Sequence, residues 1–262
     1  MPDMAVYVVS DLHGASEALR KVIPDDAILL LLGDLLNVID YIEMSGILVD
    51  VFGDQAVRQV NELRLQGDLQ EARRLMQERS RGREDEIRAE FSRLGYQQYE
   101  AVFSALGVPT YLILGNVDVP KMAAGFVTAH RSVIDADAQT FDIEGERFGF
   151  VGGALPTPLQ VAGEITEEEM LDKISALETV DVLCTHIPPA VPELCFDTLA
   201  GRMEKGSEDL LEYIQDVQPR LHYFGHVHQP LVSSMSIGRT RCVNVGYFRA
   251  TKRAYPHQGP PA

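Results

Sequence analysis

The stretch Val8-Val9-Ser10-Asp11-Leu12-His13 sets two residues of metal-binding type directly behind a short apolar run. The run itself, Ala5–Val9, has the β-branched composition of a buried strand. Residues two apart in an extended segment point the same way, so Asp11 and His13 can converge on one site. The sequence therefore predicts a strand that is followed directly by two residues able to bind a metal ion.

The same arrangement recurs at four later apolar runs. They are Leu31-Leu32-Gly33-Asp34, Leu112-Ile113-Leu114-Gly115-Asn116, Val182-Leu183-Cys184-Thr185-His186 and Tyr223-Phe224-Gly225-His226-Val227-His228. The carboxyl ends of parallel strands open onto a common crevice, where α/β sheets bind ligands. Glycines just before Asp34, Asn116 and His226 would allow close backbone approach. Each fragment alone is typical of a turn or a strand edge, but five in this order favour one shared site.

The rest of the chain alternates strands with helices, which is typical of an α/β fold. Ser16–Val22 is expected to form a helix, Thr166 with Glu169 forms a capping box, and Ser207 precedes another amphipathic helix. We expect the tail, residues 255–262, to be loosely ordered. Further strands are expected at residues 139–143, 147–151, 180–184 and 221–224, with a hairpin-like pair at 231–237 and 240–245.

Residues 38–107, between the second and third strands, are far longer than an ordinary connection. Their apolar residues recur at three- and four-residue steps, which favours helices. We expect a break near residues 80–85, then separate helices at 86–94 and 97–106. Our interpretation is a helical insertion within a single domain spanning 1–262, packed beside the active-site mouth or across a homodimer interface. Its arginines alternate with glutamates, which favours a solvated helix face over a phosphate-guiding lid.

Composition excludes several classes of function. The chain has 23 Lys and Arg against 39 Asp and Glu, a formal net charge of −16, which argues against a general nucleic-acid or anionic-membrane surface. No apolar run approaches the roughly 20 residues that span a bilayer. Three cysteines are too few for a disulfide framework. These features, with an N-terminus that lacks signal-peptide character, predict a cytoplasmic protein with reduced thiols.

Together, five motifs resemble those of the calcineurin-like metallophosphoesterases. The resemblance implies an α/β fold, a four-layer αββα sandwich, with a dinuclear metal site at the rim of two sheets. It also implies that a metal-bridging hydroxide attacks the phosphorus. The motifs are Asp11-Leu12-His13, Gly33-Asp34-Leu35-Leu36-Asn37, Gly115-Asn116-Val117-Asp118, Thr185-His186 and Gly225-His226-Val227-His228.

The resemblance also assigns ligands to the two metal ions. One ion would be held by Asp11, His13 and His228, the other by Asn116, His186 and His226, and Asp34 would bridge them. Imidazole and carboxylate ligands suit Mn, Fe, Zn, Ni or Co. Two such ions about 3.5–4 Å apart would activate water near neutral pH and clamp the phosphoryl oxygens.

One position departs from the commonest form of the third motif. Many members of the family have a histidine, thought to protonate the leaving group, where this chain has Val117. Valine cannot donate a proton, which forfeits help worth about 10²–10⁴-fold. The Gly-Asn-Val-Asp form is similar to a subgroup of small bacterial and archaeal phosphodiesterases, and to the retromer's phosphoesterase-fold subunit, a scaffold. Asp118 could orient ligands or cap the helix before Pro120, and Asn37 could touch phosphate or form a turn.

The leading hypothesis is a metal-dependent phosphohydrolase that favours phosphodiesters over monoesters, with Asp34, Asn116 and Asp118 as catalytic residues. Its substrate would be a phosphodiester or a phosphorylated small molecule. The alternative is a non-catalytic scaffold of the same fold. A site that has lost its catalytic activity should also have lost some of its metal ligands. All seven predicted ligands are present, so the sequence favours an enzyme. A protein Ser/Thr phosphatase is disfavoured by Val117 and by the lack of evident phosphate-clamping arginines.

Overall fold

The strand that leads to Asp11 lies inside a five-stranded sheet. The computed structural model describes residues 4–157 and 161–260. In the first sheet, β1 (Ala5–Val9), β2 (Ala27–Leu32), β3 (Thr110–Ile113) and β4 (Val133–Asp135) are parallel, in that order. All six residues of β2 are buried, as expected for a strand covered on both faces. The sheet therefore brings the ends of β1, β2 and β3 to one edge.

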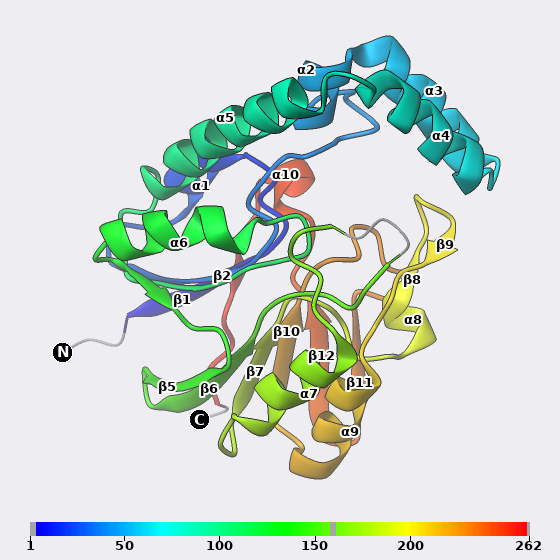
Figure 1. The fold of residues 1–262 in the computed structure, drawn as a ribbon. Helices are drawn as coiled ribbons and strands as arrows, with labels where there is room; N and C mark the ends of the chain where they lie inside the picture. Colours follow the sequence, from blue (N-terminus) through cyan, green and yellow to red (C-terminus); the bar gives the residue numbers. More distant parts are fainter. Residues whose placement is uncertain (1–3, 158–160, 261–262) are drawn as a thin grey trace.

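A second sheet of six strands packs on the first. Its order is β11 (Ser234–Ile237), β12 (Thr240–Asn244), β10 (Leu221–Phe224), β7 (Val182–Thr185), β6 (Glu146–Val151) and β5 (Gln139–Ile143). The four central strands are parallel, and the edge strands β11 and β5 are antiparallel to their neighbours. A short hairpin, β8 (Phe196–Asp197) with β9 (Arg202–Met203), stands apart from both sheets (Figure 1). The ends of β7 and β10 thus belong to the second sheet.

Helices cover the outer face of each sheet, which gives the four αββα layers that the family resemblance implies (Figure 1). One apolar cluster, with Val8 and Tyr223, fills the space between the sheets. A second joins the first sheet to α1 (Ser16–Val22), α5 (Glu84–Phe103), α6 (Pro120–Ala129) and α10 (Phe248–Thr251). A third joins the second sheet to α7 (Glu167–Ser175), α8 (Pro192–Cys195) and α9 (Glu208–Val217). No helix in the described part of the chain is long and apolar enough to cross a membrane.

Between β2 and β3 the chain forms α2 (Ile47–Phe52), α3 (Asp54–Leu65), α4 (Leu69–Ser80) and α5. The turn expected near residues 80–85 separates α4 from α5, but the second expected break is wrong, because α5 continues through Gly95. A Cβ at Gly95 would lie 3.0 Å from the Met122 sulfur, so this glycine lets α5 and α6 approach. The α3–α4 hairpin extends beyond the sheets (Figure 1).

Arginines of this region form ion pairs with acidic residues three or four positions away, within a helix or, for Arg83, from its N-cap. The pairs are Arg58–Asp54, Arg74–Glu71, Arg74–Glu78, Arg83–Glu86, Arg88–Asp85 and Arg93–Glu90. Pairs with this spacing are typical of a solvated helix face.

The expectation of a loosely ordered tail is wrong for residues 255–257. Tyr255 and Pro256 form β13, which pairs antiparallel with β1, and the His257 N–H donates to the Val6 carbonyl at 2.8 Å. The His257 ring lies 2.9 Å from a Glu146 oxygen of the second sheet. Prolines in the tail suggested disorder, but an edge strand tolerates proline, because one side needs no N–H. Residues 261 and 262 lie outside the described part.

Candidate metal centre

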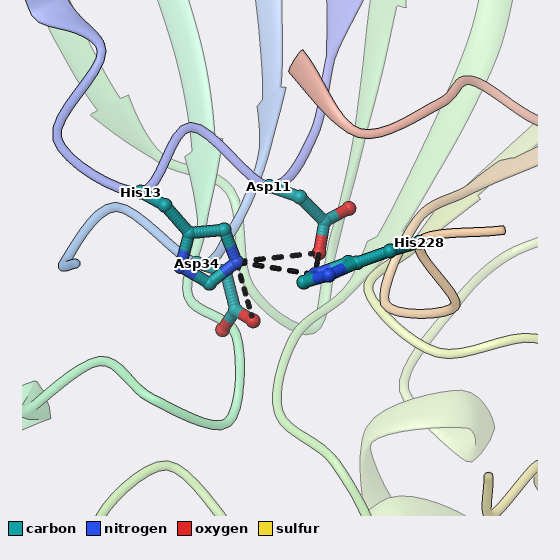
Figure 2. Close-up of side chains that lie close together, drawn as sticks. All are labelled: Asp11, His13, Asp34 and His228. Carbon is teal, nitrogen blue, oxygen red and sulfur yellow. Dashed lines mark hydrogen bonds and ion pairs between the residues drawn. The ribbon is translucent and has the colours of Figure 1, made fainter. Parts of the chain in front are cut away.

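The loops after β1, β2, β3, β7 and β10 bring all seven predicted ligand side chains to one place. Figure 2 shows the first group, in which four side chains point toward one another. The His13 Nε2 atom lies 3.2 Å from His228 Nε2 and 3.6 Å from Asp34 Oδ2. The His228 Nε2 atom lies 3.4 Å from Asp11 Oδ1. One ion could therefore contact a donor atom from each of these four residues.

A second group shares Asp34 with the first. The Nε2 atom of His186 lies 3.5 Å from Asp34 Oδ1 and 3.1 Å from the Asn116 side-chain oxygen. That same Asn116 oxygen lies 3.0 Å from His226 Nδ1. The two oxygens of Asp34 thus face opposite groups, Oδ2 toward His13 and Oδ1 toward His186. This is the arrangement expected of a bridging carboxylate.

Backbone carbonyls fix the orientation of two histidine rings. The Nδ1 atom of His13 lies 2.9 Å from the Leu36 carbonyl, and that of His186 lies 2.8 Å from the Leu32 carbonyl. A carbonyl can only accept, so each Nδ1 carries the proton, which leaves each Nε2 as a lone pair that faces the site. The rings are therefore already in the tautomer that binds a metal ion.

The ligand loops have an unusual backbone. Asp11, His13, Asp34 and His226 all have positive φ, between 39° and 67°. A non-glycine residue in this region is uncommon and costs of order 1–3 kcal/mol, so it persists only where its surroundings hold it. The loops support one another here, since the His13 N–H donates to the Asp34 carbonyl at 2.8 Å. Such strain is typical of functional sites.

Glycine is required where the loops approach most closely. A Cβ at Gly225 would overlap the Ser10 hydroxyl and an Asp11 carboxylate oxygen. A Cβ at Gly115 would overlap Asp34 and lie 2.6 Å from the His186 ring. The glycines that precede Asn116 and His226 therefore allow ligand loops of the two sheets to meet.

Burial dominates the electrostatics of the site. Burial, together with the carboxylates of Asp11 and Asp118, raises the pKa of Asp34 well above its usual value. Burial lowers the pKa of His13 to about 4 and that of His226 to about 3, so both imidazoles are neutral at pH 7. Within each of the two groups, the imidazole and carboxylate donor atoms lie within 4.8 Å of one another. A metal ion there would offset the buried negative charge. The donor set therefore fits metal ions.

His228 differs from the other histidines of the site. Burial alone would lower its pKa, but the hydrogen bond and negative charge of Asp11 outweigh burial and raise it. In turn, burial would raise the pKa of Asp11, but His228 holds it well below its usual value. Each of these two residues therefore favours the charged form of the other.

Asp118 lies behind the site and is fully buried. Its Oδ1 accepts from the Leu35 N–H at 3.0 Å and the Tyr99 hydroxyl at 3.3 Å, and its Oδ2 accepts from the Gly115 N–H at 2.9 Å. It does not cap α6, whose N-cap is Val119. Its carboxylate instead ties the loop that carries Asp34 to the loop that carries Asn116.

Two further residues of the motifs lie on the same loops as predicted ligands, Val117 after β3 and Asn37 after β2. The Val117 N–H donates to Asp34 Oδ1 at 3.0 Å. Asn37 is buried, and its side-chain oxygen is without a hydrogen-bond partner among the described residues. His222, which has no matching motif, is buried on β10 beside Thr185 and Phe224. Phe224 packs against the outer helices, so His222 lies on that side of the sheet rather than among the ligands.

Sequence reasoning missed two residues that touch the ligands. The Tyr247 ring stacks on His228, with ring centroids 4.0 Å apart and planes within 4°. Arg249, two residues further on, donates to the His13 carbonyl at 2.8 Å. No motif marks either residue, because the contacts depend on where the chain returns after β12.

Two sheets carry carboxylate and imidazole side chains at the ends of their parallel strands, which is the arrangement that the resemblance to metallophosphoesterases implies. The family model for calcineurin-like phosphoesterases matches residues 4–230, and the chain belongs to this family. Members typically use two metal ions, and metal-dependent phosphohydrolysis is their general activity.

Two solved structures are similar in fold. One crystal structure aligns with a TM-score of 0.61 at 18% identity and covers 97% of this chain and 98% of its own. The crystal structure of TT1561 from Thermus thermophilus aligns with a TM-score of 0.53 at 14% identity, over 98% and 99% of the two chains. No curated protein sequence matches the chain.

Proposed function

We propose that this protein is a dinuclear metal-dependent phosphoesterase that favours phosphodiesters and activated esters over alkyl monoesters. The observation that carries the proposal is the completeness of the ligand set. Seven donor residues from five loops form two groups, and both groups share Asp34. Strained backbone at four of these residues and the buried charges among them oppose folding. Their presence favours a protein that binds metal over one that has lost this function.

The donor set indicates which residues would hold each ion. Asp11, His13 and His228 would hold one, Asn116, His186 and His226 the other, and Asp34 both. Mn, Fe, Zn, Ni or Co suits these ligands. When bound, two such ions would activate water near neutral pH and neutralise charge on the phosphoryl oxygens.

The protein's own residues supply positioning. The Val117 N–H fixes one oxygen of Asp34, and Asp118 holds the two flanking loops at a set distance. We therefore assign Asp118 to positioning rather than to proton transfer, because its oxygens are already occupied by N–H and O–H donors. Asn37, with an unpartnered buried oxygen, is a candidate to accept a hydrogen bond from substrate or water.

Charge and residue 117 together favour diesters. A phosphodiester carries one negative charge and a dianionic monoester carries two, so an acidic protein with a net charge of −16 repels the diester less. Val117 offers no proton to the leaving group, so esters of acidic alcohols should be cleaved best. We place the protein in the cytoplasm, since its three cysteines are buried and unpaired.

Metal analysis combined with a hydrolysis screen tests the proposal. Protein purified without chelator should contain two transition-metal ions per chain and cleave bis(4-nitrophenyl) phosphate faster than alkyl phosphates. Removing the metal should abolish turnover, and restoring Mn²⁺ should recover it. Two bound ions with no hydrolysis of any ester would favour the alternative, a non-catalytic scaffold. Absence of bound metal would contradict the ligand assignment itself.

A further inference from the structure

The segment that follows β12 contacts the ligand loops without contributing a ligand. It lies beyond residues 4–230, the part that the family model matches. The Phe248 N–H donates to the Ser10 carbonyl at 3.2 Å, and the Arg249 N–H donates to the Asp11 carbonyl at 3.1 Å. Short helix α10 therefore lies directly on the loop that holds Asp11 and His13.

The Arg249 guanidinium extends this contact to two further segments. One nitrogen donates to the His13 carbonyl at 2.8 Å. The others donate to Asp40 at 2.9 Å, to Glu43 at 2.7 Å and to the Ser45 hydroxyl at 3.0 Å. The side chain is only 16% exposed, and its Asp40 partner 9%. Arg249 thus links the loop after β1 to the loop that follows Asp34.

These bonds fall on strained backbone. Asp11 has φ of 55° and His13 of 39°. The Arg249 backbone N–H donates to the Asp11 carbonyl, and its guanidinium donates to the His13 carbonyl. A residue in this region relaxes toward ordinary φ unless its peptide groups are held. Hydrogen bonds from a guanidinium are charge-assisted and directional, and its fork can hold several acceptors at fixed relative positions. Relaxation of His13 would move its Nε2 away from Asp34 and His228.

We propose that Arg249 is a positioning residue for the Asp11–His13–His228 half of the metal centre. The inference rests on the proposed function, because it requires that these side chains bind an ion. Tyr247, from the same segment, also helps to position this half of the centre. Its ring stacks on His228 and meets the His13 ring edge-on at 5.5 Å. The contacts found for Arg249 and Tyr247 do not include His186 or His226, so the effect should be confined to one half of the centre.

Metal binding by the full-length chain tests the inference. Metal-free wild type, Arg249→Met, Arg249→Lys and the control Arg253→Met would be titrated with Mn²⁺. Arg253 is an exposed arginine of the same segment. We expect Arg249→Met to weaken one of two ions by about 10–100-fold, as for other residues that orient ligands, and Arg249→Lys to weaken it less. Arg253→Met should match wild type.

Single-site backgrounds identify the affected ion. His186→Ala leaves the Asp11–His13–His228 half, and His13→Ala leaves the other half. Adding Arg249→Met should weaken Mn²⁺ binding in the His186→Ala chain and leave it unchanged in the His13→Ala chain. Equal loss in both backgrounds, with lower thermal stability of the metal-free chain, would show a merely structural role and overturn the inference.

The remaining outcomes separate the inference from the proposed function. If wild type binds two ions and Arg249→Met binds both as tightly, the inference is overturned while the proposed function stands. If wild type binds no Mn²⁺, the proposed function fails, and the inference fails with it.

Discussion

Asp34 illustrates how a residue can serve a site at the expense of the fold. It is 3% exposed, and its charge lies beside the buried carboxylates of Asp11 and Asp118. Its folded pKa is raised, so ionising it at neutral pH opposes folding unless a cation is present. The residue that both groups share therefore opposes folding of the metal-free protein when it is ionised.

We predict that Asp34→Asn stabilises the metal-free protein while abolishing hydrolysis. Asparagine keeps an acceptor for the Val117 N–H and removes the buried charge. Chemical denaturation in EDTA at pH 7 should show a gain of about 0.5–2 kcal/mol, in the range of ordinary stabilising changes. Asn116→Ala, which also removes a ligand but no charge, is the control, and it should abolish hydrolysis without stabilising. A loss of metal-free stability in Asp34→Asn would contradict this account.

At Val117, a substitution can add the proton donor to the leaving group that this chain lacks. Val117→His should raise turnover most for the poorest leaving groups, because a general acid helps where charge accumulates on the departing oxygen. Rates across a series of aryl diesters would be plotted against the leaving-group pKa. The wild-type slope should be steep and the variant slope shallower, with a gain of up to about 10²-fold for the least acidic alcohols. A flat wild-type plot with rate-limiting chemistry would mean that another group already donates.

At this scale, sequence reasoning brings residues together where side-chain chemistry and spacing coincide. The seven residues that it predicts as ligands lie close together in the structure, because each follows a buried strand and has a side chain of metal-binding type. Tyr247 and Arg249 could not be found in this way, since their contacts with His228 and His13 depend on the path of the chain after β12. The anchoring role of Asp118 likewise depends on Tyr99, which lies on a helix that sequence alone does not place.

Helix ends were predicted well where their signals are local. Thr166 accepts from the Glu169 N–H at 3.1 Å, and the Glu169 carboxylate accepts from the Thr166 N–H at 2.7 Å. We predict that Thr166→Ala lowers stability by about 0.5–2 kcal/mol without changing turnover, because α7 lies on the outer face of the second sheet. Urea denaturation measures the loss. Thr128→Ala, at an exposed position in the last turn of α6, should cost less, and an equal cost would argue against the cap.

Helix interiors were predicted less well, and Gly95 shows why. A glycine in a helical pattern costs about 1 kcal/mol relative to alanine, so it reads as a break. Here it faces the Met122 sulfur across the α5–α6 contact, and the helix continues. The sequence shows the low helix propensity of Gly95, but it does not show that Met122 packs against this position and compensates for it. The edge strand β13 was missed for the same reason, because its partner β1 lies at the opposite end of the chain.

For the molecule as a whole, the candidate metal centre lies where the two sheets meet. The first sheet contributes Asp11, His13, Asp34 and Asn116, and the second contributes His186, His226 and His228. Ions bound at this junction should therefore stabilise the packing of one sheet on the other.

Metal removal should accordingly lower the melting temperature. Binding only to the folded state at 100 times the dissociation constant contributes about 2.7 kcal/mol per site. Thermal unfolding followed by circular dichroism with EDTA, and then with added Mn²⁺, measures the shift. Asp34→Asn should show little response to Mn²⁺. A melting temperature of wild type that is independent of Mn²⁺ would contradict binding at this junction.

The acid limit of stability should depend on a histidine outside the metal centre. His222 is fully buried on β10, its Nε2 lies 2.8 Å from the Thr185 hydroxyl, and its Nδ1 is among the buried atoms without a partner in the described part. Burial lowers its pKa from 6.5 to about 3. Between those values the unfolded chain binds a proton that the folded chain does not. Stability therefore falls as pH drops from about 6.5 toward 3, by up to about 1.4 kcal/mol per pH unit.

We predict that His222→Phe removes this part of the pH dependence. Phenylalanine fills the same apolar space beside Phe224 and cannot bind a proton. Denaturation in EDTA between pH 7 and 4 measures the free energy of unfolding of both proteins. Below pH 6, the difference between the variant and wild type should grow in favour of the variant by about 1.4 kcal/mol per pH unit. Protonation of the predicted metal ligands affects both proteins equally, so this difference reports on His222. Thr185→Val keeps the histidine and removes its hydrogen-bond partner, so its slope should match wild type. Parallel curves for His222→Phe and wild type would mean that the buried ring binds its proton as readily as in the unfolded chain, and that water reaches β10 through the outer helices.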